Sequence, residues 1–101
     1  MRMLFKIKLP HDTFNAAVKD GSVGQKMQRI LDATKPEAVY FTEFDGHRTA
    51  ILIVDMTDSS QIPSLCEPWF LLFHADCEVH PAMTPADLAK AGLEGLGKKW
   101  S

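Results

Sequence analysis

The dipeptide Asp45-Gly46 constrains the fold of this chain most, because it lies between two runs of strand-forming residues. Asp-Gly favours a type I′ turn, in which two residues reverse the chain. A turn of this length also fixes how the flanking strands pair, and we expect these strands over residues 37–44 and 47–54. The facing residues match in charge or in character, which stabilises a hairpin: Phe44–His47, Glu43–Arg48, Thr42–Thr49, Phe41–Ala50, Tyr40–Ile51 and Val39–Leu52.

Before the hairpin, the sequence predicts one strand and an interrupted helical region. Residues 3–9 alternate between apolar and mostly charged side chains, as a strand does when one of its faces lies in a core. Apolar residues at helical spacing follow over 14–34, with Asp12 or Thr13 as the expected helix cap. Gly21 and Gly24 each disfavour a helix by about 1 kcal/mol relative to alanine. We therefore expect a break there.

After the hairpin, the sequence predicts two helical regions separated by a strand. Two prolines are expected to start helical segments, one over 62–65 and one from about Pro68 to His74, because proline fits the first turn of a helix. Residues 76–83 alternate again and predict the fourth strand. Thr84 and the proline after it predict the start of a last helix. One stripe of this helix carries the apolar residues Ala89, Leu93, Leu96 and Trp100.

The resulting order, β-α-β-β-α-β with a tight central hairpin, predicts a ferredoxin-like α+β sandwich with an extra C-terminal helix. We expect residues 1–101 to form one such domain, with strand order 4-1-3-2 and the helices on one face of the sheet. The other face of such a sheet is polar in a monomer, yet the segment Ala50–Val54 is apolar on both sides of its strand. We therefore expect a homodimer in which a second sheet covers this face, with the C-terminal helix as the alternative cover.

Charge and composition argue against several classes of protein. The net charge is −2 and the basic residues are scattered, whereas nucleic-acid binders gather theirs on one face. The longest apolar run, Ala50–Val54, is too short to cross a bilayer, and residues 1–9 alternate unlike a signal peptide. We therefore expect a cytoplasmic protein without nucleic-acid or membrane partners. Cys66 and Cys77 are expected to be free thiols, and no CxxC or HxxxH spacing supports a metal site. We also expect no cofactor.

His80 is the strongest candidate for a catalytic residue, together with Glu78. The alternation of the fourth strand places both on the same sheet face. If this strand pairs with the first, Lys6 and Lys8 lie on that face too, and we expect Lys8 near Glu78 to neutralise its carboxylate. A Glu-His-Lys cluster inside a dimer could act as an acid/base site. It could equally be an ion network that fixes the dimer.

Candidate ligand-binding residues are Tyr40, Trp69 and His47. Tyr40 and Trp69 each combine an apolar body with a polar group, which suits a pocket for an aromatic or hydrophobic ligand. Packing in the core is the alternative role for both. His47 borders the hairpin turn, where exposure to solvent is the alternative, and His74 lies near a helix end, where the helix dipole favours a cation. Binding of haem or a metal through His47, His74 or His80 is the least favoured hypothesis.

Three segments resemble a known family: Asp45-Gly46-His47-Arg48 leading into Ala50–Val54, then Glu67-Pro68-Trp69-Phe70, and finally Glu78-Val79-His80-Pro81. Together they resemble the dimeric α+β barrel superfamily over most of residues 3–83. This superfamily includes muconolactone-isomerase-like and YCII-like proteins and cofactor-free monooxygenases. The resemblance implies a homodimer that binds a small hydrophobic or aromatic metabolite, as a cofactor-independent isomerase or monooxygenase-like enzyme. The alternative is a non-catalytic module that binds another protein through the apolar sheet face and the C-terminal helix.

Overall fold

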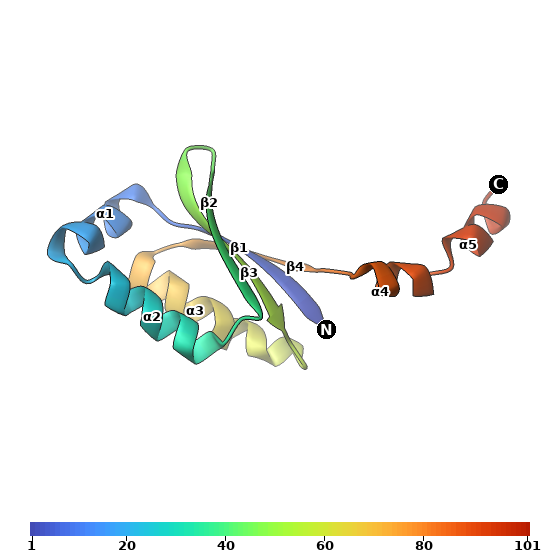
Figure 1. Ribbon diagram of the computed structural model, residues 1–101, viewed down its shortest axis with the longest axis horizontal. Helices are drawn as coiled ribbons and strands as arrows, with labels where there is room; N and C mark the ends of the chain where they lie inside the picture. The colour runs from blue at the N-terminus through green and yellow to red at the C-terminus, as the bar shows by residue number, and fades with distance from the viewer.

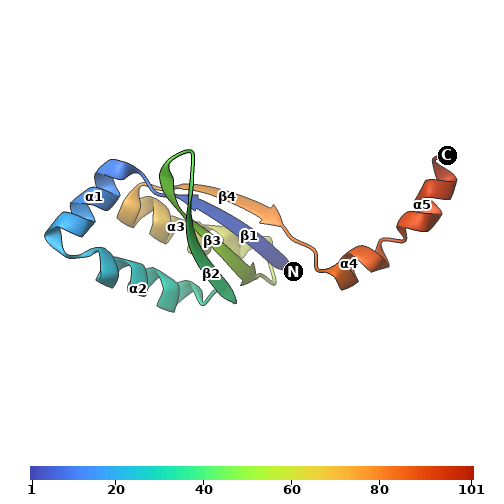
Figure 2. The same ribbon diagram turned by 45° about the horizontal axis from the view of Figure 1, so that its top comes forward.

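The computed structural model describes all residues from 1 to 101 as an antiparallel sheet, a layer of helices and a protruding C-terminal segment (Figure 1). The elements in chain order are β1 (Arg2–Lys8), α1 (His11–Asp20), α2 (Val23–Thr34), β2 (Ala38–Phe44), β3 (His47–Asp55), the short 3-10 helix η1 (Ser59–Gln61), α3 (Ile62–Phe73), β4 (Asp76–Pro81), α4 (Pro85–Lys90) and α5 (Leu93–Lys99). Helices α1, α2 and α3 lie on one side of the sheet (Figure 2). The chain is thus an α+β protein, compatible with a ferredoxin-like fold.

The four strands lie in the order β2-β3-β1-β4, and every neighbouring pair is antiparallel. From the β4 edge the order is the predicted 4-1-3-2. The hairpin between β2 and β3 has the predicted register in every pair, from Phe44–His47 at the turn to Val39–Leu52. At the turn, Asp45 has a φ of 55° and Gly46 a φ of 76°, which is the pair of left-handed residues that a type I′ turn requires.

The core lies between the sheet and helices α1 to α3. On the sheet side, alternate residues of β1 and β3 are buried, and Leu9 extends the row beyond β1. On the helix side, α3 contributes Trp69 and Phe73, α2 contributes Ile30 and α1 contributes Ala17. The buried apolar residues of β1 and β3 are Met3, Phe5, Ile7, Ala50, Leu52 and Val54, and the polar Thr49 of β3 is buried as well. The predicted core face of the first strand is therefore confirmed.

The first helical region differs from expectation at its start and agrees with it at its break. Helix α1 begins at His11 after Pro10, so neither Asp12 nor Thr13 is its N-cap. The Thr13 hydroxyl instead donates a hydrogen bond to the carbonyl of Phe73, which ties α1 to the end of α3. The predicted break lies at Gly21, whose φ of 81° ends α1 before α2 begins.

Helix α3 is continuous, so the prediction of two segments was wrong. Pro63 lies in its first turn, but Pro68 lies inside the helix. A proline in a helix interior costs about 3 kcal/mol, because it removes one hydrogen bond and crowds the preceding turn. Side chains buried on both sides of Pro68, Cys66 before it and Trp69 and Phe73 after it, hold the helix against the sheet. Burial of three such residues outweighs this local cost.

The C-terminal segment forms two helices rather than the single one predicted. Gly92 has a left-handed φ of 66° and separates α4 from α5. The predicted cap is confirmed: the Asp87 N–H donates to the Thr84 hydroxyl at 3.1 Å, and the Thr84 N–H donates to the Asp87 carboxylate at 3.0 Å. Hydrogen bonds with Thr84 lower the pKa of Asp87 below its ordinary value, and the bond from the backbone N–H of Thr84 has the largest effect.

Residues 82–101, called the arm below, extend away from the sheet in both views (Figures 1 and 2). Every residue from Pro85 onward is exposed, and Met83 is exposed as well because β4 ends at Pro81. The radius of gyration is 16.9 Å, against about 13 Å for a compact chain of this length. The arm therefore does not cover the second face of its own sheet. None of the helices has the length and apolar character needed to cross a membrane.

The turn yields a stability prediction. Gly46→Val should lower the free energy of unfolding by about 1–2 kcal/mol, because a β-branched residue is strained at positive φ. A Cβ at Gly46 meets no atom within 4 Å, so the loss would come from the backbone alone. Gly46→Asn is the control and should cost less, since asparagine tolerates this conformation. Equal losses for both variants in urea denaturation would contradict this explanation.

Candidate functional site

The sheet face opposite the helices, called the open face below, has no cover within the chain (Figure 2). The strand register aligns three rows of residues across all four strands. These rows are Ala38–Ile53–Leu4–His80, Tyr40–Ile51–Lys6–Glu78 and Thr42–Thr49–Lys8–Asp76. The centre of the open face is therefore apolar around Leu4, Ile51 and Ile53, and ionisable side chains lie beside it on β1 and β4.

The ionisable side chains form one contact cluster. The His80 imidazole Nε2 lies 3.3 Å from Glu78 Oε1, and Lys6 Nζ lies 3.8 Å from Glu78 Oε2. Lys6 Nζ is also 4.2 Å from the centre of the Phe44 ring, a cation–π contact. The Glu78 carboxylate thus binds the imidazole with one oxygen and the ammonium group with the other.

The predicted pairing of β4 with β1 is confirmed, but the lysine beside Glu78 differs from the one expected. The register places Lys6 opposite Glu78, whereas Lys8 lies opposite Asp76. Lys8 Nζ is instead 3.7 Å from Asp45 Oδ2, at the hairpin turn. Lys6 therefore takes the neutralising role expected of Lys8.

The cluster is accessible to solvent. The His80 side chain is 59% exposed and that of Glu78 57% exposed. Exposed ion pairs contribute about 0–1 kcal/mol to stability, so folding of this chain gains little from the cluster. An imidazole that donates Nε2–H to a carboxylate keeps Nδ1 as a proton acceptor. The arrangement can therefore take a proton from a ligand, with Glu78 orienting the imidazole.

The structure separates Tyr40 from this cluster within one chain. Tyr40 lies in the same row as Lys6 and Glu78 and is 65% exposed. It lies on β2, however, three strands from β4. With strands about 4.8 Å apart, roughly 14 Å separate Tyr40 from Glu78.

Trp69 and His47 lie apart from the open-face cluster. Trp69 is fully buried in the core, 6.3 Å between ring centres from Phe73, and its indole N–H has no hydrogen-bond partner. His47 stacks on His11 at the end of the hairpin, with ring centres 4.4 Å apart. His74 ends α3 in a left-handed conformation and is exposed. Of the predicted site residues, the fold brings only Glu78 and His80 into contact.

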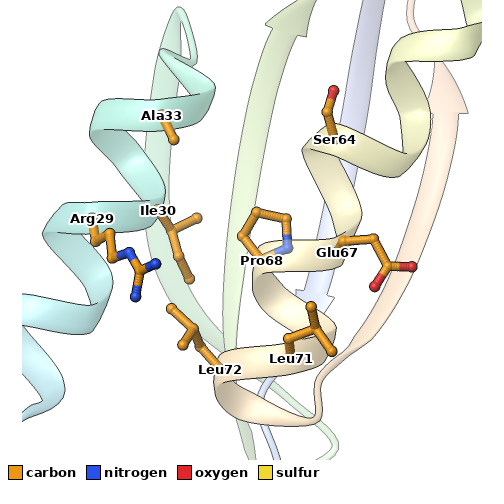
Figure 3. Close-up of a pocket in the computed structure, with 8 residues that line it drawn as sticks. All are labelled: Arg29, Ile30, Ala33, Ser64, Glu67, Pro68, Leu71 and Leu72. Atoms are coloured by element: carbon orange, nitrogen blue, oxygen red, sulfur yellow. The ribbon is translucent and has the colours of Figure 1, made fainter.

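A groove between α2 and α3, which the sequence analysis missed, has a volume of about 390 Å³ (Figure 3). Its walls are mainly apolar and include Ile30 and Leu72. Arg29 lies on the α2 side, and Glu67 points away from α2 (Figure 3). Leu71 lines the groove and is 73% exposed, although its position in an apolar run predicts burial. The length of this apolar run was the only sequence signal for an uncovered apolar surface on the helix. The groove lies in the helix layer, on the opposite side of the sheet from the open face.

Both cysteines are free thiols, as predicted. Burial raises the pKa of the Cys77 thiol to about 12, and the neighbouring Cys66 adds to this rise. Burial raises the pKa of Cys66 as well. No group of three or more His, Cys, Asp or Glu side chains is arranged to hold a metal ion.

No protein-family model matches the chain, and no curated protein matches it either.

The raised thiol pKa predicts slow chemical modification of native Cys77. At pH 8, the native state should contain roughly a thousandfold less thiolate at this position than an unfolded chain with the ordinary pKa of 9.0, and thiolate is the reactive form. Iodoacetamide labelling, followed by mass spectrometry of the Cys77 peptide with and without urea, measures the difference. Equal labelling rates in the two states would contradict the burial of this thiol.

The same shift predicts how stability depends on pH. A thiol that holds its proton more tightly in the native state stabilises that state below pH 9.0, the ordinary pKa. The contribution is lost as the pH rises from 9.0 towards the native pKa of about 12. The free energy of unfolding should fall over this range, and Cys77→Ser should reduce the fall. An identical pH profile for the two proteins would contradict the assignment to Cys77.

Proposed function

We propose that this protein is a homodimer, that the open face is its interface, and that a small hydrophobic or aromatic metabolite binds within this interface. The observation that supports the proposal is the apolar centre of the open face. Leu4, Ile51 and Ile53 line neighbouring strands there, and no element of the chain covers them. Apolar surfaces of this kind on soluble chains usually bind a partner.

The charges of the open face favour one arrangement of the two sheets. A two-fold axis along the strands would stack the β2 edge of each sheet over the β4 edge of the other. An axis across the strands would instead bring the two β4 strands together, and with them the carboxylates of Asp76 and Glu78. Like charges so close are destabilising, which favours the first arrangement.

The first arrangement would also assemble the site from both copies. Tyr40 of one protomer would lie over the Glu78–His80 pair of the other, although the same residues are roughly 14 Å apart within one chain. An aromatic ligand could then contact the phenol ring while its acidic C–H or O–H meets His80. The resemblance of the hairpin and of the Glu78–Pro81 segment to the dimeric α+β barrel superfamily supports the same assembly.

Proton transfer is the chemistry that these residues favour. His80 would remove a proton from one carbon of the ligand and return it to another, while Lys6 would stabilise the negative charge that develops. Such an isomerisation consumes no co-reactant and needs no cofactor. A cofactor-independent isomerase is therefore the proposed activity.

The second candidate is a non-catalytic module that recognises another protein. The exposed arm favours it, because its two helices, the first of them capped, carry apolar side chains and have no core of their own. This candidate uses the open face and the arm together as one binding surface. A different protein that stoichiometrically co-purifies with the chain would support it.

The dimer is tested by its mass and by one charge substitution. We expect light scattering to give about twice the 11.3 kDa of the chain at micromolar concentration. Ile51→Asp should dissociate the dimer, because a buried unpaired charge costs several kcal/mol. Leu71→Asp is the control, an exposed leucine on α3 that should leave the mass unchanged. A wild-type chain that remains monomeric would refute the proposal.

The role of His80 is tested with a ligand found by thermal-shift screening of small aromatic and aliphatic metabolites. The imidazole resonances of His80 should move when this ligand binds, and His80→Gln should abolish its turnover while the dimer mass is kept. His74→Asn is the control, since it removes an exposed histidine from a left-handed position that asparagine tolerates. Unchanged turnover in His80→Gln would exclude His80 as the base.

A further inference from the structure

In the arm, the apolar side chains of helices α4 and α5 do not pack against the core. Helices α4 and α5 have no buried residue. Their exposed apolar residues are Leu88, Leu93, Leu96 and Trp100, of which Trp100 is 78% exposed. Leu93, Leu96 and Trp100 follow the i, i+3, i+7 spacing that places them along one side of α5.

The arm nevertheless has a defined local structure. The reciprocal hydrogen bonds of Thr84 and Asp87 cap α4, and the left-handed Gly92 fixes the angle to α5. Helices of six and seven residues are unstable alone in water, and most helical stability in proteins comes from packing an apolar side. The apolar side of the arm therefore requires a surface to pack on.

The arm leaves the body in a direction that takes it away from its own open face. The Ala82 N–H donates to the Arg2 carbonyl at 3.0 Å, which holds the arm's first residue at the end of the sheet. The Thr84 cap lies two residues further on. Both views show the arm running onward from the end of β4 (Figures 1 and 2).

Charge favours a second copy of this chain as the surface that receives the arm. The arm carries three lysines and two acidic residues, whereas residues 1–81 carry more acidic than basic side chains. The lysines include Lys98 and Lys99 at the far end of α5. The net positive charge of the arm is thus complementary to the net negative charge of residues 1–81 in a second copy.

We propose that the arm of one protomer packs against the β2 edge of a second copy, next to Tyr40, and so closes the ligand site. This proposal rests on the dimer proposed above, in which the β4 edge of one sheet, from which the arm departs, lies over the β2 edge of the other. That edge is where unpartnered aromatic side chains gather: Tyr40 and Phe41, on opposite faces of β2, are both more than half exposed. The Leu93–Leu96–Trp100 side of α5 supplies the apolar surface to cover Tyr40.

Trp100 reports on the arm directly. The chain has two tryptophans and one tyrosine, and Trp69 is fully buried. The difference in emission between the wild type and Trp100→Phe therefore isolates Trp100. In the dimer we expect this difference signal to resist quenching by iodide, and to become quenchable on dilution to the monomer. Energy transfer from Tyr40 to Trp100 should appear with the dimer and vanish in Tyr40→Phe.

A second pair of variants tests the packing without relying on fluorescence. Leu96→Asp should weaken the dimer by about tenfold or more, as substitutions of apolar interface anchors do. Glu94→Gln on the same helix, whose side chain is 88% exposed, should leave the dimer unchanged.

Four outcomes overturn the inference, and the first three are distinguishable from failure of the dimer itself. A stable dimer with quenchable Trp100 and an unaffected Leu96→Asp variant would be consistent with the sheet interface but would refute packing of the arm on the second copy. Protection of Trp100 at every concentration would mean that the arm covers its own chain. Protection in the dimer without transfer from Tyr40 would refute the β2 edge as the receiving surface. A wild-type monomer would refute both proposals.

Discussion

The type I′ turn at Asp45-Gly46 is the constraint on which the rest of the sheet depends. Side chains alternate between the two faces of a strand, so a slip of one residue would exchange the faces of β3. The turn sets the register that points Ala50, Leu52 and Val54 into the core. Ile51 and Ile53 then necessarily lie on the open face. The pairings of β1 with β3 and of β4 with β1 continue these two faces across the whole sheet.

Packing decided which local sequence signals were obeyed. Pro68 interrupts a helix intrinsically more than Gly92 does, yet α3 continues through Pro68 and the C-terminal helix divides at Gly92. Helix α3 lies on the core, where Trp69 and Phe73 hold the segment after the proline. The arm has no buried residue to oppose the preference of its glycine. A single sequence shows the propensity of each breaker but not the burial that competes with it.

The contrast between local propensity, which a sequence shows, and burial, which it does not, explains how far the fold and the candidate site could be predicted. Strand pairing, strand order, the cap at Thr84 and the helix break near Gly21 follow from local chemistry and alternation, and they were predicted. The face shared by Glu78 and His80 followed from the same alternation. That Lys6 rather than Lys8 lies beside Glu78 depends on the offset between β1 and β4, which a helical connection does not fix. The α2–α3 groove depends on how two helices pack, and no pattern within either helix specifies that.

The Lys6–Glu78–His80 cluster acquires a different meaning if the open face is an interface. Exposed to water, its contacts of 3.3 and 3.8 Å contribute little to stability. Covered by a second sheet, the same three groups would lie in a medium of lower effective dielectric, where each electrostatic interaction is stronger. An arm packed against the β2 edge of that sheet would exclude the remaining water. The open face and the arm, which pack least within a single chain, would then complete the environment that acid–base chemistry needs.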